Sequence, residues 1–350
     1  MDKSNNLGIK EIAKLANVSI GTVDRVLHNR TGVSAATRKK IQHIIKETGY
    51  TKNILASRLK LAARKKIKIA ILIPEIKNEW SYWKAPQKGI KKAVKELKEQ
   101  GISIQFFHFN FLHPQSFSEK CGTIFSEAFD GIITVSFLEK ESNDLLVKSI
   151  KQNIPVVFLD TERPLKYSAN FIRQNSVNAG MVAGRLLHGL VGNDGQYFVV
   201  NILNEDGIQI NNRQRESGFR AFFNKNFKNK SIAIHTINHP LENDFEITEA
   251  LKQLFSNEKT KGIFVTNARS FLIPQILKEN NISDTFIVGF DLNRQNLALL
   301  KTGQISFLIN QKPEYQGYTA IKSLYKFLTE NDDSELNVEI PVEIIVKENA

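Results

Sequence analysis

The stretch of residues 9–50 constrains this 350-residue chain most, because its apolar residues recur at helical spacing. Ile9, Ile12, Ala13 and Ala16 are spaced i, i+3, i+4 and i+7, which places them on one face of a helix. Residues 17 and 18 interrupt that face. Ser19 is well placed to cap a second helix, since its hydroxyl can accept a hydrogen bond from a free amide of the first turn.

The second and third helices of this stretch are equally short. Val23, Val26 and Leu27 form the apolar stripe of the second helix. Ser34 can cap the third helix, whose apolar face consists of Ile41, Ile44 and Ile45. Two short helices across a tight turn, supported by a third, have the geometry that inserts a recognition helix into the major groove of DNA. A generic three-helix bundle is the alternative.

The segment resembles the headpiece of the lactose-repressor (LacI/GalR) family of bacterial transcription regulators. The resemblance covers about fifty residues almost without a gap. It is carried by the Ile-Ala-Ala core of the first helix and by Val18, Ser19, Thr22, Val23, Arg25, Val26, Leu27, Val33, Ser34, Thr37 and Arg38. It implies an all-α helix-turn-helix headpiece over residues 1–51.

The resemblance implies a DNA contact for the second helix. Arg25 matches a position that contacts DNA, where it can offer a bidentate pair to a guanine. Ile20 and Gly21 match the two positions that vary between members with different operators. Asp24 departs from the family, which usually has serine there, and we expect its carboxylate to pair with Arg25 or a neighbouring base. The predicted DNA-binding residues are Ser19, Ile20, Gly21, Thr22, Arg25, His28, Ser34, Thr37, Ala56 and Leu59, of which Ser19, Thr22, Ser34 and Thr37 are expected to bond phosphates.

Residues 52–66 are expected to connect the headpiece to the rest of the chain. Asn53, Ala56 and Leu59 resemble the family's hinge helix, in which the leucine wedges into a minor-groove step and the alanine allows two hinge helices to approach closely. Lys52 stands where a proline is common, which weakens helix initiation. A plain basic linker is the alternative.

The charge distribution supports this division. The chain has a formal net charge of +12. Residues 1–66 hold 15 Lys+Arg against 4 Asp+Glu, and the remainder holds 33 against 32, so nearly all the excess lies on the predicted DNA-binding part. A single cysteine fits a reducing cytoplasm, and neither a signal peptide nor a membrane-spanning run is visible. We expect a cytoplasmic protein without membrane association.

From residue 67 the pattern changes to short apolar strands that alternate with amphipathic helices. Continuous apolar strands are buried on both faces of a parallel sheet, and ten of them suit two doubly wound α/β lobes over residues 67–350. This matches the two-lobed, periplasmic-binding-protein-like effector and dimerisation module of the family. The predicted strands are 67–74, 102–107, 131–135, 156–160, 197–202, 232–237, 262–266, 286–291, 305–309 and 342–346. A polar loop over 330–337 is expected before the last strand.

The effector is expected between the lobes, at the carboxyl ends of the strands. The resemblance implies that Asp160, Asn267, Asp291 and Gln311 face this cleft, and Arg215 has the family's spacing to a Gly-Phe pair. Carboxylates, amides and arginine suit a polyol, because each hydroxyl can both donate and accept. The predicted ligand-binding residues are Trp80, Trp83, Asp160, Arg213, Arg215, Asn267, Asp291 and Gln311. The aromatic residues fit either a sugar face or simple packing between the lobes.

Three functions compete at this stage. The first is a ligand-responsive regulator that binds a pseudo-palindromic operator as a homodimer, with a monosaccharide or derivative as effector and a nucleobase or sugar phosphate as alternatives. The second is a sugar-binding protein for transport or sensing, suggested by residues 67–350. The third is an enzyme with Asp160 and Asp291 as an acid/base pair, but no nucleophile motif, metal cluster or phosphate loop supports it. We expect no catalytic activity, metal or cofactor. Dimer against tetramer, and release from DNA against recruitment to it, stay open.

Overall fold

The computed structural model describes residues 9–27, 33–48, 66–76, 81–203, 209–227, 232–240 and 259–350. The chain divides into two compact units, Met1–Lys65 and Lys66–Ala350. The predicted hinge helix, with Ala56 and Leu59, lies outside the described residues, as do His28 and Trp80. The boundaries proposed at residues 51 and 66 therefore stay predictions.

The described residues of the first unit form three helices: α1 (Ile9–Ala16), α2 (Ile20–Leu27) and α3 (Ala35–Thr48). Both predicted caps are confirmed, because Ser19 Oγ accepts a hydrogen bond from the Thr22 amide at 3.1 Å and Ser34 Oγ one from the Thr37 amide at 3.2 Å. Asn17, with φ of 58°, makes the left-handed turn between α1 and α2. The predicted stripes meet in a core of Ile12, Ala13, Ala16, Val23, Val26 and Ile41.

The second unit has two α/β lobes with one six-stranded sheet each. The sheet of lobe 1 has the order β11-β5-β4-β3-β1-β2, and all its strand pairs are parallel. Its strands are β1 (Ile67–Pro74), β2 (Ile102–Phe109), β3 (Gly131–Val135), β4 (Val156–Asp160), β5 (Asn170–Gln174) and β11 (Val338–Ile340). The helices of this lobe are α5 (Lys84–Leu97), α6 (Pro114–Ser126), α7 (Glu139–Gln152) and α13 (Pro313–Glu330).

The sheet of lobe 2 repeats this order as β12-β10-β9-β8-β6-β7, but its last strand, β12, pairs antiparallel with β10. Its strands are β6 (Gln196–Leu203), β7 (Ile234–Pro240), β8 (Lys261–Val265), β9 (Thr285–Phe290), β10 (Phe307–Asn310) and β12 (Glu343–Ile345). Its described helices are α8 (Ser176–Val191), α9 (Ile210–Asn226), α11 (Ile273–Glu279) and α12 (Arg294–Lys301). None of the helices in the described part of the chain is long and apolar enough to cross a bilayer.

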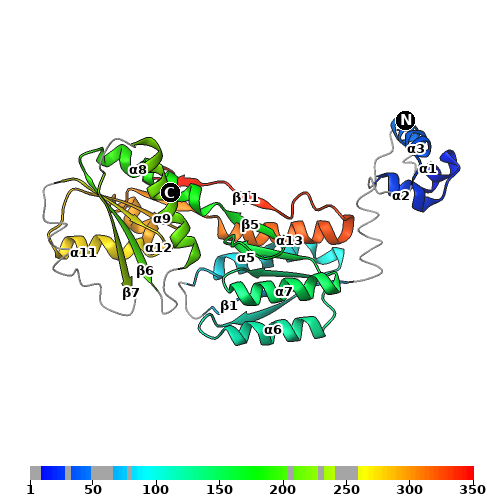
Figure 1. Ribbon diagram of the computed structural model, residues 1–350, viewed down its shortest axis with the longest axis horizontal. Coiled ribbons are helices and arrows are strands. Elements are labelled where there is room, and N and C mark those ends of the chain that lie inside the picture. Colours follow the sequence, from blue (N-terminus) through cyan, green and yellow to red (C-terminus); the bar gives the residue numbers. More distant parts are fainter. Residues whose placement is uncertain are drawn as a thin grey trace. The chain divides into compact units, whose positions relative to one another are not determined.

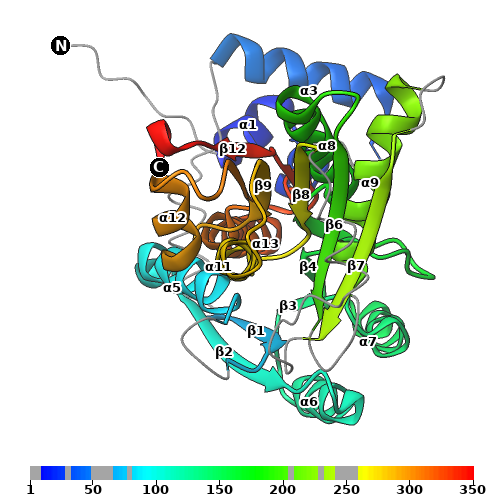
Figure 2. The ribbon, with the colours of Figure 1, turned by 90° about the vertical axis from the view of Figure 1, so that its left-hand side faces the viewer.

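Helices cover both faces of each sheet. In lobe 1, α5 and α13 lie on one side of the sheet and α6 and α7 on the other (Figure 2). Two helices pack on a different lobe from the strand that precedes them in the chain. The helix α8 follows β5 of lobe 1 but packs against α9 and lobe 2, whereas α13 follows β10 of lobe 2 but packs against α5 in lobe 1 (Figure 1).

These two crossing helices touch their neighbours through glycine. A Cβ added to Gly89 of α5 would lie 1.7 Å from the Glu314 carbonyl oxygen of α13. A Cβ added to Gly180 of α8 would lie 1.9 Å from the Arg215 carbonyl oxygen of α9. The helix axes therefore approach more closely than any side chain at these positions would permit, and both lobes have such a glycine contact between two helices.

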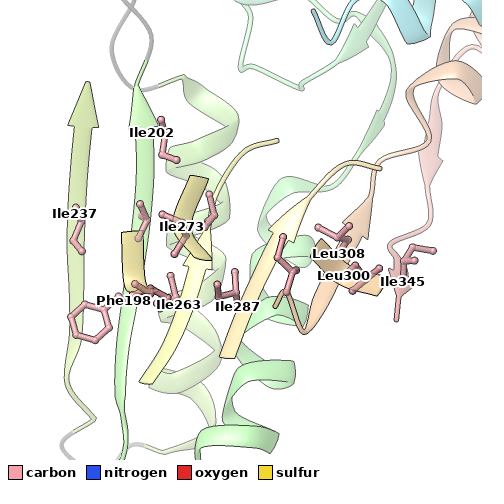
Figure 3. Close-up of a cluster of buried hydrophobic side chains, with 13 residues drawn as sticks. Phe198, Ile202, Ile237, Ile263, Ile273, Ile287, Leu300, Leu308 and Ile345 are labelled. Carbon is pink, nitrogen blue, oxygen red and sulfur yellow. The ribbon is translucent and has the colours of Figure 1, made fainter. Parts of the chain in front are cut away.

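The core of lobe 2 lies on both faces of its sheet. On the face shown in Figure 3, branched aliphatic side chains from successive strands lie side by side, with α11 and α12 packed over them. Phe198, Ile263, Ile287 and Leu308 of this cluster are at most 1% exposed. Burial of each such side chain contributes about 1.5–3 kcal/mol, so packing on this face of the sheet stabilises the lobe.

The predicted fold class is confirmed, with corrections to the strand count. The bounds of β1, β3 and β4 are as predicted, and the other predicted strands are displaced by one to three residues at one or both ends. Two strands, β5 and β11, were not predicted, so twelve strands rather than ten occur in the described residues. The polar stretch expected before the last strand, residues 330–337, instead precedes both β11 and β12.

Candidate functional site

The exposed surface of α2 carries the residues expected to read DNA. Ile20 is 45% exposed, and Gly21 and Arg25 are exposed as well. A Cβ at Gly21 would meet only Ser19 Oγ, at 3.8 Å, so the backbone does not require glycine there. This position can therefore vary without a cost to the fold, as a specificity position must.

The hydroxyls expected to contact phosphate are paired with one another at the two caps. Ser19 Oγ lies 2.9 Å from Thr22 Oγ1, and Ser34 Oγ lies 2.8 Å from Thr37 Oγ1. Each pair is exposed at the start of a helix, where free amides and the helix dipole favour an anion. The side chain of Asp24 lies outside the described residues, so its expected pairing stays a prediction.

In the second unit, side chains from both lobes form one hydrogen-bonded network. We call this the interlobe polar cluster, and its members are Tyr82, Asp160, Arg215, Asp291, Gln311 and Gln316. Asp160 ends β4 and Asp291 directly follows β9, so each stands at the carboxyl end of the fourth strand of its lobe. Both aspartates have left-handed backbones, with φ of 73° and 68°. Aspartate tolerates this region better than most residues, which suits these two turns.

Arg215 anchors the lobe 2 side of the cluster from α9. Its side chain is 2% exposed, and its guanidinium lies 3.8 Å from the centre of the Phe290 ring. The guanidinium donates to the Thr266 carbonyl oxygen at 2.7 Å and to Gln311 Oε1. Its Nε is buried and has no partner in the described residues. The Nε–H of the buried Arg215 guanidinium can thus donate to an acceptor supplied by a ligand.

Gln311 connects this arginine to Asp291. Its amide donates to both carboxylate oxygens of Asp291, at 2.8 and 3.0 Å. Burial raises the pKa of Asp291 to about 6, although the charge of Arg215 and the bond from Gln311 act in the opposite direction. Burial also lowers the pKa of Arg215, while Asp291 and Asp160 raise it. At neutral pH Asp291 is therefore a carboxylate with a cationic neighbour, although it titrates within reach of physiological pH.

Gln316, the first buried side chain on α13, connects the lobes. Its amide donates to the Gln311 carbonyl oxygen at 2.9 Å, and its Oε1 accepts from the Asp160 amide at 3.1 Å. The Asp160 carboxylate then accepts the Tyr82 hydroxyl at 2.5 Å and the Thr161 hydroxyl at 2.8 Å. Burial and the charge of Asp160 raise the pKa of Tyr82 well above its usual value. Tyr82 is thus a neutral donor at any physiological pH.

The other predicted ligand residues occupy different environments. Trp83 is 6% exposed and packs edge-on against Tyr82 and Phe137, with ring centres 5.2 and 5.9 Å apart. Asn267 donates to the Ile202 carbonyl oxygen at 2.7 Å, which ties the ends of β6 and β8 together. Arg213 is exposed on α9 and has no hydrogen bond to the cluster among the described residues.

The cluster is closed in this conformation. Asp160 is 6% exposed and Asp291 8% exposed. A surface pocket of about 430 Å³ lies elsewhere, along β5 and β11 of lobe 1, and no member of the cluster lines it. The pocket lacks a converging set of polar groups from both lobes, so the cluster is the better candidate for a ligand site.

Sequence reasoning missed Gln316 and the bond of Tyr82 to Asp160. The signal for Gln316 is visible in retrospect. It stands one residue before Gly317 and four before Ala320, on the buried and mostly apolar face of α13. A polar residue on a buried apolar face needs a partner, and here both ends of the amide have one. No group of three or more His, Cys, Asp or Glu that could hold a metal occurs in the described residues.

Comparison with known proteins agrees with this organisation. Residues 69–332 match the family described as periplasmic binding protein domain, and residues 8–53 match bacterial regulatory proteins, lacI family. The fold is thus that of a two-lobed periplasmic-binding-protein-like protein with a DNA-binding headpiece. The chain belongs to the periplasmic binding protein domain family over most of its length, and its headpiece matches the lacI family of bacterial regulatory proteins.

Its relatives are named as regulators rather than as enzymes. The transcriptional repressor PurR of Mannheimia succiniciproducens is 23% identical over 346 residues, which cover 97% of this chain and 98% of PurR. The transcriptional regulator DegA of Bacillus subtilis is 27% identical over 213 residues, which cover 61% of this chain and 59% of DegA.

Among solved structures, a putative LacI transcriptional regulator from Bacteroides fragilis has a TM-score of 0.71 at 28% identity and covers 81% of this chain and 98% of its own. GanP, a glucose-galactose binding protein from Geobacillus stearothermophilus, has a TM-score of 0.66 at 22% identity and covers 81% of this chain and 99% of its own. The second likeness shows the fold alone.

Proposed function

We propose that this protein regulates transcription in response to a neutral monosaccharide, binding a two-fold symmetric operator as a homodimer. The observation that carries the effector half of this proposal is the interlobe polar cluster. Its acceptors and donors come from both lobes and meet at the carboxyl ends of the two sheets. A ligand held there touches both lobes, and can therefore change their relative position.

The DNA half of the proposal rests on α2 and the two caps. Arg25 lies exposed in the last turn of α2, from which it can reach a guanine edge in the major groove. The paired hydroxyls of Ser19 and Thr22 stand at the start of α2, where they can fix the register on a phosphate. The net charge of +11 on residues 1–66 supplies attraction to the DNA backbone.

The chemistry of the cluster favours a neutral polyol. Two carboxylates face one guanidinium, so the cluster has a net charge of −1 when both aspartates are ionised. An added phosphate would meet this negative charge in a buried site, where an unpaired charge is costly. Sugar hydroxyls can donate to Asp160 and Asp291 and accept from Arg215, whose Nε is unpartnered in the described residues. Sugar binding by GanP, which has this fold, supports the same class.

A solute-binding protein for transport or sensing is the second candidate. The two lobes alone suit it equally well, as the likeness to GanP indicates. The LacI-type headpiece at residues 8–53 favours the regulator. The regulator is therefore preferred because of a feature that lies outside the ligand site.

The proposal is tested by selecting bound sequences from random duplex DNA with the full-length protein. The selection is run without a ligand and with D-glucose, D-galactose and other neutral aldoses, and with glucose 6-phosphate and adenine as the competing classes. A two-fold symmetric site whose affinity changes with a neutral sugar supports the proposal. A response only to the phosphate or to adenine would discard the neutral sugar, and no enriched sequence would favour the solute-binding alternative.

A pair of variants then tests the role of α2. Arg25→Ala is expected to cost about 1–3 kcal/mol of operator binding and to relax one operator position. Lys39→Ala, an exposed cation on α3, serves as the control and should weaken binding to all sequences alike. An unchanged base preference in Arg25→Ala would contradict direct readout by this residue.

A further inference from the structure

In the part of the second unit that the structure describes, three segments cross between the two lobes. They are residues 174–176 between β5 and α8, residues 310–313 between β10 and α13, and residues 340–343 between β11 and β12. Any movement of one lobe against the other has to change the backbone of these three crossovers. Contacts among them therefore set the resistance to that movement.

One buried side chain bonds the first crossover to both of the others. Gln174, the last residue of β5, is 3% exposed. Its amide nitrogen donates to the Asn310 carbonyl oxygen at 3.0 Å and to the Pro341 carbonyl oxygen at 3.4 Å. Each of these acceptors belongs to a different crossover. The amide is buried away from water. If its two hydrogen bonds break, the amide and both carbonyl oxygens are therefore left without partners.

A second, more exposed set of contacts joins two of the crossovers. The Glu343 carboxylate accepts from the Asn310 amide at 2.7 Å and lies 2.9 Å from Lys312 Nζ. The Asn310 side chain also accepts from the Lys312 backbone amide at 2.9 Å, which supports the left-handed backbone of Lys312, with φ of 52°. The side chains of Lys312 and Glu343 are 36% and 37% exposed, so water screens this pair. The buried hydrogen bonds of Gln174 therefore hold the crossovers together more strongly than the exposed contacts of Glu343 do.

The closed state of the interlobe polar cluster shows why the crossovers matter. Asp160 and Asp291 are nearly buried, and the cluster bonds lobe 1 to lobe 2 through Gln316 and Gln311. A sugar can enter only when the lobes part. The arrangement in which both aspartates are close together is therefore one of at least two states, and it depends on contacts away from the ligand as well as on the cluster itself.

We propose that Gln174 is a positioning residue that ties the three crossovers together and holds the lobes in the arrangement that brings Asp160 and Asp291 into one network. It does so without contacting the effector. Its position in the first crossover places both bonds at the axis of movement, where a small change is magnified at the outer ends of the lobes.

The test measures the distance between the lobes in the full-length protein by pulsed electron-spin resonance. Spin labels are attached at Glu119→Cys in lobe 1 and Lys278→Cys in lobe 2, both exposed positions. Cys121 is 4% exposed and burial raises its thiol pKa to about 12, so it stays unlabelled. The distance distribution is compared between the labelled parent and Gln174→Met, which retains the length of the side chain and removes the donor.

The control is Asn143→Leu, which removes two buried hydrogen bonds within lobe 1 alone. Asn143 is 7% exposed, donates to the Glu139 carbonyl oxygen and accepts from the Lys166 amide, both at 2.8 Å. Gln174→Met is expected to broaden the distribution and move it to longer distances, whereas Asn143→Leu lowers the melting temperature but leaves the distribution as in the parent. Should Gln174→Met fail to fold, Gln174→Glu is measured instead, since a carboxylate cannot donate to either carbonyl.

An unchanged distribution in a folded Gln174 variant overturns the assignment, whatever the DNA and sugar experiments give. The consequence for signalling rests on the proposed function. If an aldose changes operator binding, Gln174→Met should raise the concentration needed for half the response about tenfold, because two lost hydrogen bonds depopulate the state that the sugar binds. A broadened distribution without any sugar response would contradict the proposed effector and leave the role of Gln174 intact.

Discussion

The two lobes of the second unit share a scaffold and differ in chemistry. Both sheets have the same strand order, and both place an aspartate with a left-handed backbone after the fourth strand. In lobe 2 the helix α12 joins the fourth and fifth strands, whereas in lobe 1 residues 161–169 join them without a helix. Asp291 is bonded by an amide beside a guanidinium, and Asp160 by two hydroxyls. A repeated fold can thus hold two carboxylates with different hydrogen-bond partners in a single site.

The largest expected effect tests the shared scaffold. Gly89→Ala and Gly180→Ala should each cost about 3 kcal/mol or more in free energy of unfolding, because each new Cβ would fall within 2 Å of a backbone carbonyl oxygen of the neighbouring helix. Gly122→Ala in α6 and Gly189→Ala in α8 are the controls, since a Cβ there meets nothing within 4 Å. The free energy of unfolding of these control variants should be unchanged or should rise by up to about 1 kcal/mol. Urea unfolding measures all four, and a mild effect at only one crossing would break the equivalence of the lobes.

The next effect concerns the raised pKa of Asp291. A pKa near 6 in the folded state, against about 3.9 in the unfolded chain, means that ionisation opposes folding. The contribution of this group is most favourable below pH 4, declines as the pH rises to 6, and is constant above that. The Asp291→Asn variant cannot ionise at this position, so its stability does not decline for this reason as the pH rises. Asparagine also tolerates the left-handed backbone conformation of residue 291. Relative to the parent, the variant's free energy of unfolding should therefore be about 2–3 kcal/mol higher at pH 7 than at pH 4.

Asp332, between α13 and β11 of lobe 1, provides a control of opposite sign. Hydrogen bonds from Ser334 and Lys326 hold the pKa of Asp332 below its usual value. Asp332→Asn should therefore lose stability relative to the parent as the pH rises from below 4 to neutrality. Chemical unfolding at a series of pH values measures both differences. If the stabilities of the two variants relative to the parent changed in the same direction with pH, a raised pKa of Asp291 would be contradicted.

Lobe 1 should respond to the loss of a single hydroxyl. Tyr82→Phe removes the donor to the Asp160 carboxylate, and the loss should cost about 1.5–3 kcal/mol, as for other bonds to a charged group. Tyr315→Phe on α13 is the control, because this side chain is 52% exposed, and its effect should stay within about 0.5 kcal/mol. Equal melting temperatures for the two variants would show that Tyr82 does not stabilise Asp160.

The smallest effect distinguishes the two crossing helices. The Asn175 side chain caps α8 by accepting from the Asn178 amide at 3.0 Å, whereas α13 has no side-chain cap and begins with a proline. Asn175→Ala should cost about 1 kcal/mol in free energy of unfolding, and Asn175→Asp should restore most of it. A loss of the same size in both variants would assign the effect to the crossover rather than to the cap.

Most of the fold could be predicted from the sequence because burial and periodicity coincide. The strands β1, β3 and β4 are almost continuously apolar, and their bounds follow from that pattern. The strand β5 mixes polar and apolar residues, and β11 has only three residues at the edge of the sheet. Their extended conformation depends on hydrogen bonds to strands distant in sequence, which no local pattern reports.

The candidate site divides in the same way. Asp160, Asp291, Arg215 and Gln311 were expected from their places after strands or in a motif, and the structure brings all four into one network, although their role with a ligand stays a proposal. The bridging bond of Gln316 to the Asp160 amide joins residues 156 positions apart and could not be read locally. The orientation of an amide is decided by its tertiary neighbours, and the same holds for Gln174.

The crossing of α8 and α13 also has a consequence for biosynthesis. The strands β1 to β5 leave the ribosome first, but lobe 1 also needs α13 and β11, which are made after β6 to β10. Synthesis of lobe 1 therefore begins first and ends last. The helix α5 lacks its packing partner α13 for as long as lobe 2 is being synthesised. A nascent chain that stalls before residue 313 would expose the face of α5 that includes Gly89. Chaperones that hold apolar surfaces would have their longest opportunity there.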